Sequence, residues 1–361
     1  MIDYRDGFVQ SLAEDIERLI AGESVSPETL FERLLELAER NCPAVARYFA
    51  DTARGRGVPD TAFKSSMPYL FPGVEPEICF ETSGTSGSVK GRAPYSPLGA
   101  QLLRSTIVTG ARAHITQELE RPAIVRLVPS QAQAPTMVMA HGMELISNAL
   151  GDGKASGSVV GPAGVDFAAL SRLLGRAIAA DQPVVLIGGS FAFVNLCERL
   201  VVEKKRFALP KGSRVVDAGG FKGRSRSMPV DALRALIADR FGVAPGRFTN
   251  IFGMTELASQ LYDDEDRPLG PLGERPKVAA PYVWPRLRSP FDMNLTAHGQ
   301  GLLEVVDLCI LDRPCVVLTG DLAVGDGRGI ALAGRAQLES SRGCSLTLDT
   351  LTKHAVDDAR A

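Results

Sequence analysis

Between residues 82 and 91 the chain reads Thr82-Ser83-Gly84-Thr85-Ser86-Gly87-Ser88-Val89-Lys90-Gly91. Glycines let backbone N–H groups approach an anion closely, hydroxyls add further donors, and Lys90 adds a positive charge. This chemistry suits a triphosphate. The stretch is not a Walker A sequence, because Val89 stands where that spacing needs its second glycine. The alternative interpretation is a flexible connector rich in serine and glycine.

Outward from this loop, short apolar runs alternate with helical patterns. The loop itself lies between a strand expected at 78–80 and a helix expected at 98–114. Further strands are expected at 123–128, 183–187, 214–217 and 248–251, and helices at 165–180, 191–202 and 230–241, the last ending at Gly242. Strands that alternate with helices predict an α/β fold with a mostly parallel sheet.

The two ends of the chain differ from this middle part. Apolar residues at helical spacing predict helices in the first fifty residues, where Ser26 and Pro27 form an N-cap and N1 pair. After residue 285, strands are expected at 302–306, 315–318 and 329–332 with no helical pattern between them. This change of pattern predicts a smaller β-rich lobe.

Composition excludes several classes of protein. A length of 361 residues allows two or three lobes, and 45% hydrophobic with 23% charged residues is typical of a globular protein. The net charge of -2 lacks the basic surplus of a nucleic-acid binder. The N-terminus is acidic, which predicts no signal peptide. The apolar runs are far shorter than the ~18 residues of a membrane span, which predicts no membrane partner. Together these features predict a cytoplasmic location. Six scattered cysteines predict reduced thiols rather than disulfides or a structural metal site.

Two further stretches carry groups suited to a nucleotide. Asn250-Ile251-Phe252-Gly253-Met254-Thr255-Glu256 leaves a strand through a glycine, and a carboxylate there can hold Mg²⁺ against phosphates. Thr319-Gly320-Asp321, followed by Gly334-Arg335, offers a carboxylate for ribose hydroxyls and a guanidinium for hydroxyl or phosphate. Taken alone, each stretch is also compatible with a turn, in which Thr255 caps a helix or Asp321 makes an Asx bond.

In this order, the stretches resemble the adenylate-forming (ANL) superfamily of acyl-CoA synthetases, peptide synthetase adenylation domains and firefly luciferase, over roughly residues 77–345. Within it, the chain is most similar to the short acyl-protein synthetases. These include the fatty-acid-activating subunit of the bacterial luminescence reductase and a relative from phenazine antibiotic biosynthesis. The closer similarity lies in Gly188-Gly189-Ser190-Phe191-Ala192-Phe193, Gly219-Gly220-Phe221-Lys222-Gly223-Arg224, Phe252-Gly253-Met254-Thr255-Glu256-Leu257 and Arg342-Gly343-Cys344-Ser345-Leu346.

The resemblance implies a large adenylation domain at 1–340 with two stacked, mostly parallel sheet lobes and a smaller β-rich lobe. Its expected parts are a helical N-terminal region at 1–76, the α/β lobes at 77–285 and the β-rich lobe at 286–340. Residues 341–361 are expected to form a short tail in place of a C-terminal lid domain, because only 26 residues follow Arg335 (361 minus 335). That lid supplies a lysine in full-length relatives, so here Lys222, a partner chain or no lysine at all takes its place.

The resemblance also implies a role for each matching residue. The loop that wraps the ATP phosphates corresponds to Thr82, Ser83, Gly84, Thr85, Ser86, Gly87 and Lys90. The stretch that lines the adenine corresponds to Gly219, Gly220 and Phe221. The remaining nucleotide contacts are Thr255 for the α-phosphate, Glu256 for Mg²⁺, Asp321 for the ribose, and Arg335 as the partner of Asp321.

The sequence indicates the residues that would bind the acyl group less clearly than those that would bind the nucleotide. Phe191 and Phe193 are candidates for the wall of the acyl pocket, with plain core residues as the alternative, and Gly253 and Met254 are expected to line the substrate. His141 is either a residue that closes the acid site or a structural histidine. By analogy with the luminescence synthetase, Cys344 is the candidate acyl carrier, since Arg342 beside it favours the thiolate. A small buried residue is the alternative.

The resemblance implies an enzyme that joins an aromatic or fatty acid to ATP, giving an acyl-adenylate and pyrophosphate. The acyl group then passes to a thiol, either on this chain or on a partner reductase. A ligase that transfers to CoA or a carrier protein is the alternative within the enzyme class, and a non-catalytic binder is the alternative outside it. The presence of Lys90, Glu256, Asp321 and Arg335 together favours the enzyme. Secondary-metabolite biosynthesis and a homo-oligomeric state are further expectations.

Overall fold

The computed structural model describes residues 1–65, 69–82, 90–219, 228–270 and 274–335. The chain forms two compact units. Within the described residues, unit 1 consists of Met1–Thr106, Met254–Ser259 and Pro276–Arg335, and unit 2 consists of Ile107–Gly253 and Gln260–Arg275. The boundary between them falls within helix α5 (Pro97–Ala111). Each unit is described separately.

Unit 1 begins with helices: α1 (Gly7–Ile20), α2 (Pro27–Asn41), α3 (Pro43–Asp51) and the short α4 (Ala62–Ser65). One face of α1 is fully buried through Val9, Leu12 and Ile16, as the helical spacing predicted. The N-cap predicted at Ser26 is confirmed, because its Oγ accepts a hydrogen bond of 3.2 Å from the backbone N–H of Thr29.

Unit 1 contains a mostly antiparallel sheet in the order β14 (Leu295–Thr296), β13 (Val283–Arg288), β15 (His298–Asp307), β16 (Val316–Asp326), β17 (Ile330–Arg335) and β12 (Lys277–Val278). Strand β1 (Val58–Pro59) pairs with β16 in parallel. Strands β2 (Ile78–Glu81) and β3 (Arg92–Tyr95) form a separate antiparallel pair. From residue 276 to 335 the described chain contains strands and turns only, in line with the expected β-rich region.

Unit 2 is built on a mostly parallel sheet in the order β11 (Leu261–Asp263), β10 (Phe248–Phe252), β9 (Arg214–Ala218), β8 (Val184–Gly189), β4 (Ala123–Leu127) and β5 (Gly157–Ser158). All neighbours in it are parallel except β10 and β11. A small hairpin joins β6 (Val160–Gly161) to β7 (Gly164–Val165). The helices are α6 (Val138–Leu150), α7 (Phe167–Ala179), α8 (Ser190–Val202) and α9 (Val230–Phe241), with a π-helical turn at Arg112–Thr116 and a 3₁₀ turn at Pro245–Arg247.

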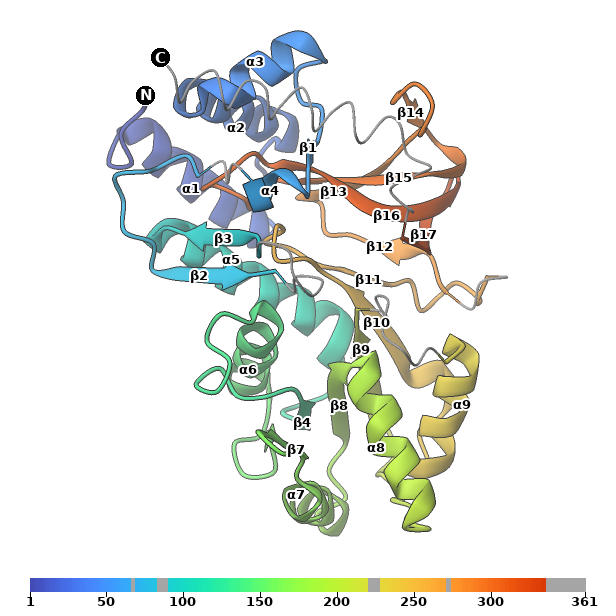
Figure 1. Cartoon of the computed structure of the whole chain (residues 1–361). Helices are drawn as coiled ribbons and strands as arrows, with labels where there is room; N and C mark the ends of the chain where they lie inside the picture. Colours follow the sequence, from blue (N-terminus) through green and yellow to red (C-terminus); the bar gives the residue numbers. More distant parts are fainter. Residues whose placement is uncertain (66–68, 83–89, 220–227, 271–273, 336–361) are drawn as a thin grey trace. The chain divides into compact units, whose positions relative to one another are not determined.

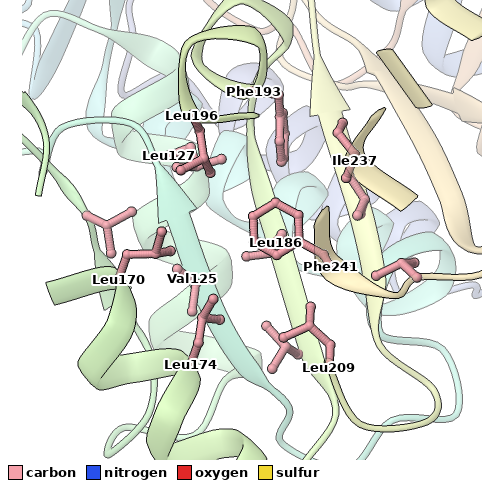
Figure 2. Packing of buried hydrophobic residues seen from close by; sticks show 14 of the residues in the cluster. Val125, Leu127, Leu170, Leu174, Leu186, Phe193, Leu196, Leu209, Ile237 and Phe241 are labelled. Atoms are coloured by element: carbon pink, nitrogen blue, oxygen red, sulfur yellow. The ribbon is translucent and has the colours of Figure 1, made fainter. Parts of the chain in front are cut away.

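Helices and sheet of unit 2 share one apolar core. Figure 1 shows α8 and α9 side by side, and Figure 2 shows how Leu186 of β8 and Phe193 of α8 face the side chains of neighbouring elements. The close approach of β8 to β4 requires glycine at residue 188, where an added Cβ would lie 2.5 Å from the Cβ of Leu127. Gly242 ends α9 with a left-handed φ of 69°, as predicted.

The α/β fold with a mostly parallel sheet is thus confirmed in unit 2, and the strands and helices predicted between 123 and 251 are all present. One expectation was wrong. The glycine-rich loop does not join a strand to a helix, because β2 and β3 flank it as antiparallel partners, with Glu81 opposite Arg92. Helix α6 was not predicted. The expected lobe boundaries stay predictions. Among the helices of the described ranges, none is long and apolar enough to cross a membrane.

Candidate functional site

Unit 1 gathers acidic side chains around Arg335, the last residue of β17. Asp321 of β16 lies directly opposite it in the strand register, and Nε of Arg335 lies 3.2 Å from Oδ1 of Asp321. Nη2 of the same guanidinium lies 3.4 Å from Oδ2 of Asp60. Burial alone would lower the pKa of Arg335, but the charges of Asp321, Asp60 and Glu256 raise it above its ordinary value. The electrostatic influence of Glu256 links this carboxylate to the predicted ribose-binding pair.

The Thr319–Asp321 segment of strand β16 is fixed by hydrogen bonds from its neighbours and from Asp60. The Thr319 hydroxyl donates to the carbonyl of Leu303 at 2.8 Å and accepts from the N–H of Asp321 at 3.1 Å. The N–H of Gly320 donates to Oδ2 of Asp60 at 3.3 Å. Asp60 was not predicted, because nothing in its local sequence marks it. It reaches this segment of β16 through the pairing of β1 with β16.

Buried polar groups hold the backbone of the segment that contains Thr255 and Glu256. Glu256 is 5% exposed, and its carbonyl accepts a 3.0 Å hydrogen bond from Nε of Arg313. The hydroxyl of Tyr95 on β3 donates to the carbonyl of Leu257 at 3.0 Å and accepts from Nη2 of Arg313. The Arg313 guanidinium also lies over the Tyr95 ring, 4.3 Å from its centroid. Arg313 and Tyr95 therefore fix the backbone on which Glu256 sits.

A buried carboxylate holds the next two residues of the same segment. Asp307 accepts hydrogen bonds of 2.8 and 2.7 Å from the N–H groups of Ala258 and Ser259, and of 2.8 Å from the Ser259 hydroxyl. Burial raises the pKa of Asp307, and these donors act in the opposite direction. The backbone from Glu256 to Ser259 is thus anchored by Arg313, Tyr95 and Asp307.

The glycine-rich loop lies largely outside the described residues, since Ser83, Gly84, Thr85, Ser86 and Gly87 fall in the gap at 83–89. Its two ends are joined: the N–H of Thr82 donates to the carbonyl of Gly91, and the N–H of Gly91 donates to the Thr82 hydroxyl, each at 2.8 Å. Lys90 is 61% exposed and pairs with Glu81 at 3.0 Å. Its ammonium is therefore held at the base of the loop by a solvent-exposed ion pair.

Unit 2 has a cavity of about 110 Å³ beside Gly219, the residue after β9. Oδ2 of Asp217 accepts hydrogen bonds from the Ser190 hydroxyl at 3.0 Å and from the Asn250 amide at 2.9 Å. The remaining lining residues come from α9, β10 and the chain before β12: Val230, Leu233, Arg234, Ile237, Phe248 and Glu274. Gly220, Phe221 and Lys222, predicted beside Gly219, lie outside the described residues. The cavity lies where the carboxyl ends of parallel strands place ligands in open α/β sheets.

The residues predicted for the acyl group are spread over several elements. Phe193 is 0% exposed and packs in the core of unit 2 (Figure 2), while Phe191 is only half-buried. His141 is buried on α6, Met254 is buried, and Gly253 is exposed. The burial of Phe193 agrees with the alternative of a core residue. The acyl roles of the others stay predictions.

The described cysteines can be compared as thiolate donors. Burial raises the pKa of Cys197 and of Cys315, each to about 12, and that of Cys309 well above its ordinary value. These thiols are protonated at neutral pH and poor nucleophiles. Cys344 lies outside the described residues.

Comparison with solved structures identifies the fold. A crystal structure of 2-hydroxyisobutyryl-CoA ligase with 2-HIB-AMP and CoA aligns with a TM-score of 0.61 at 14% identity, covering 85% of this chain and 73% of that one. A long-chain-fatty-acid-CoA ligase from Archaeoglobus fulgidus aligns with a TM-score of 0.52 at 16% identity, covering 74% of this chain and 53% of that one. The chain therefore has the fold of the adenylate-forming ligases, as the resemblance implied.

Sequence comparison adds the family. No curated protein matches the chain. A family model described as "Acyl-protein synthetase, LuxE" matches residues 75–352, which is well over half of the chain. This match agrees with the expected similarity to short acyl-protein synthetases and with the expectation of an enzyme. The chain belongs to the LuxE family of acyl-protein synthetases.

Proposed function

We propose that the protein activates a carboxylic acid with ATP to form an acyl-adenylate and pyrophosphate, and then passes the acyl group to a thiol. The observation that carries this proposal is the cluster in unit 1, where Arg335 pairs with Asp321 and Glu256 lies within its electrostatic reach. Family membership supports the same reaction class. A protein that bound acyl groups alone would have no use for this combination of charges.

Asp321 and Arg335 are our candidates for the ribose. Only Oδ1 of Asp321 receives a side-chain hydrogen bond within the described part of the chain, so Oδ2 is open to a hydroxyl group. A carboxylate accepts hydrogen bonds only, and two adjacent ribose hydroxyls are donors that match it. The cavity beside Gly219, lined by the polar groups of Asp217 and Asn250, is our candidate for the adenine.

Thr255 and Glu256 are our candidates for the phosphate and metal contacts. Mg²⁺ is commonly bound through one or two carboxylates together with substrate phosphates, and a buried carboxylate on a fixed backbone fits that role. When bound, the ion neutralises charge that develops on the phosphate oxygens. Thr255 is half-buried directly before Glu256, so its hydroxyl is available to donate to an α-phosphate oxygen.

In the proposed step, an oxygen of the substrate carboxylate attacks the α-phosphorus of ATP. A bond forms between that oxygen and phosphorus, and the bond to the bridging oxygen breaks, so that pyrophosphate leaves with its electron pair. The chain's main contribution is to hold the two anions in line, which can supply on the order of 7–11 kcal/mol of the barrier. Lys90, freed from its exposed pair with Glu81, would offset the negative charge.

Cys344 is our candidate acceptor on this chain. Three of the described cysteines are buried and protonated, so they compete poorly for the acyl group. Attack of the Cys344 thiolate on the acyl carbon would form a thioester and release AMP. The alternative acceptors are CoA, a carrier protein or a downstream reductase. With any of these, an acyl group from labelled acid would leave the chain instead of staying on it. We propose an aromatic or fatty acid as substrate.

Exchange of labelled pyrophosphate into ATP tests the activation step. With Mg²⁺ and a panel of aromatic and aliphatic acids, at least one acid is expected to drive label into ATP. The Glu256→Ala variant should lower the exchange rate by roughly 100-fold, because several kcal/mol of charge stabilisation are lost. Glu75→Ala, an exposed glutamate of the same unit, is the matched control and should exchange at the wild-type rate. ATP binding without exchange for any acid would favour a non-catalytic binder.

A further inference from the structure

The N-terminal region contributes one carboxylate to the Asp321–Arg335 cluster. Asp60 follows β1 directly, and it lies outside the residues 75–352 that match the family. Its side chain is only 10% exposed, and Oδ2 contacts both the Gly320 N–H at 3.3 Å and Nη2 of Arg335 at 3.4 Å. Asp60 is therefore a group whose role the reaction described above does not explain.

Asp60 is held in place by several independent contacts. Its N–H donates to the carbonyl of Leu318 at 2.9 Å, which continues the parallel pairing of β1 with β16. Gly57 lies against the same strand so closely that a Cβ there would be 2.7 Å from the backbone nitrogen of Leu318. The Gly57 N–H donates to the buried Glu304 at 2.8 Å. The carboxylate of Asp60 is thus built into the sheet rather than carried on a loose segment.

The arrangement divides one guanidinium between two carboxylates. Nε of Arg335 goes to Asp321 and Nη2 goes to Asp60. An arginine beside a single carboxylate prefers a two-point pair that uses both carboxylate oxygens. Such a pair on Asp321 would engage Oδ2, the oxygen that our proposed function assigns to a ribose hydroxyl. Asp60 prevents this by holding Nη2.

We propose that Asp60 is a positioning residue that keeps Arg335 from closing on both oxygens of Asp321, and so keeps Asp321 open to the ribose. The inference rests on the proposed function for the identity of the ligand. It adds that the N-terminal region, outside the matched family segment, sets how strongly the enzyme discriminates ATP from nucleotides that lack a ribose hydroxyl.

The Asp60→Asn variant separates this role from a purely structural one. Asparagine has the same shape and can still accept from the Gly320 N–H, but it lacks the charge that holds Nη2. We expect the KM for ATP to rise about tenfold, the size of one lost charge-assisted hydrogen bond, with kcat and the KM for the acid unchanged. The preference for ATP over 3′-deoxyATP should fall by a similar factor, because an engaged Oδ2 no longer distinguishes the two. Asp292→Asn, an exposed aspartate of the same unit, should change neither quantity.

Repeating the Asp60→Asn substitution in the Arg335→Gln variant tests whether the effect of Asp60 acts through Arg335. In Arg335→Gln protein there is no guanidinium to close on Asp321, so adding Asp60→Asn should leave the ATP to 3′-deoxyATP ratio of that background unchanged. Equal effects of Asp60→Asn in both backgrounds would overturn the proposal, as would an unchanged ratio in the single variant. Loss of the fold in Asp60→Asn would also count against it, since a structural role would then suffice.

Failure of the proposed function would look different. Wild-type protein that exchanges no pyrophosphate with any acid contradicts the adenylation reaction. The role of Asp60 can still be read from binding alone, by comparing how far ATP and 3′-deoxyATP raise the thermal unfolding midpoint of wild type and variant. Wild-type protein that binds ATP and 3′-deoxyATP equally would contradict the ribose assignment of Asp321, whatever Asp60 does.

Discussion

At the scale of single residues, the position of Glu256 depends on buried side chains that make hydrogen bonds to the backbone around it. Arg313 donates to the carbonyl of Glu256, to the carbonyl of Pro94 at 3.4 Å and to the hydroxyl of Tyr95. Its side chain is almost fully buried, so water would not readily replace these three hydrogen bonds if the guanidinium were lost. The fixed fork of donors explains why arginine stands here rather than lysine.

Replacing Arg313 by lysine should therefore cost both stability and activity. A lysine ammonium is a point charge that cannot reach the three acceptors with the same geometry, and unpaired buried groups cost about 1–3 kcal/mol each. We expect a lower midpoint in denaturant unfolding, together with a fall in kcat for pyrophosphate exchange that exceeds any change in KM. Arg40→Lys, at an exposed position on α2, is the control. A variant that lost stability but kept the wild-type kcat would show that Arg313 supports only the fold.

At the scale of elements, the sequence predicted the strands and helices that have a periodic apolar pattern and the features that depend only on neighbouring residues. The apolar runs of β4, β8, β9 and β10 and the helices between them were predicted, because a buried parallel sheet needs continuous apolar strands. The end of helix α9 at Gly242 was also predicted, because it depends only on the local backbone conformation of that glycine. The motif stretches around Glu256 and Asp321 were found because they carry groups suited to a nucleotide and because their order along the chain resembles that of the adenylate-forming superfamily.

Contacts between distant segments were not predictable in this way. Asp60 reaches Gly320 across 260 positions, and Arg313 reaches Pro94 across 219. The first contact depends on the pairing of β1 with β16, and the second joins β3 to the chain between β15 and β16. No local pattern specifies either. The location of the glycine-rich loop was mispredicted for a related reason: the short strand β3, Arg92–Tyr95, contains a proline and lacks a strand-like alternation.

Strand packing in unit 2 offers a test of the sheet itself. The Gly188→Ala variant should destabilise the protein by about 1–3 kcal/mol, because its Cβ would lie 2.5 Å from the Cβ of Leu127 and would push β8 away from β4. Gly189→Ala is a matched control at the next position, where the nearest atom to an added Cβ is 3.9 Å away. Equal unfolding midpoints for the two variants in urea would contradict the tight packing described here.

At the scale of the whole molecule, the chain combines a fold shared with acyl-CoA ligases and a family match to acyl-protein synthetases. Each unit supplies groups of a different kind. Unit 1 carries the charged cluster of Asp60, Glu256, Asp321 and Arg335, and unit 2 carries the cavity beside Gly219. The fold alone would not distinguish an enzyme from a binding protein. The charged cluster is what makes adenylation the function best supported.

The fate of the carboxylate oxygens tests adenylation most directly. A substrate acid labelled with ¹⁸O in its carboxylate, for example benzoate or tetradecanoate, is incubated with the protein, ATP and Mg²⁺, and the products are separated for mass spectrometry. Attack on the α-phosphorus, followed by acyl transfer to a thiol, predicts one ¹⁸O atom in each AMP released and none in pyrophosphate. Label in inorganic phosphate, or AMP without ¹⁸O, would contradict the account.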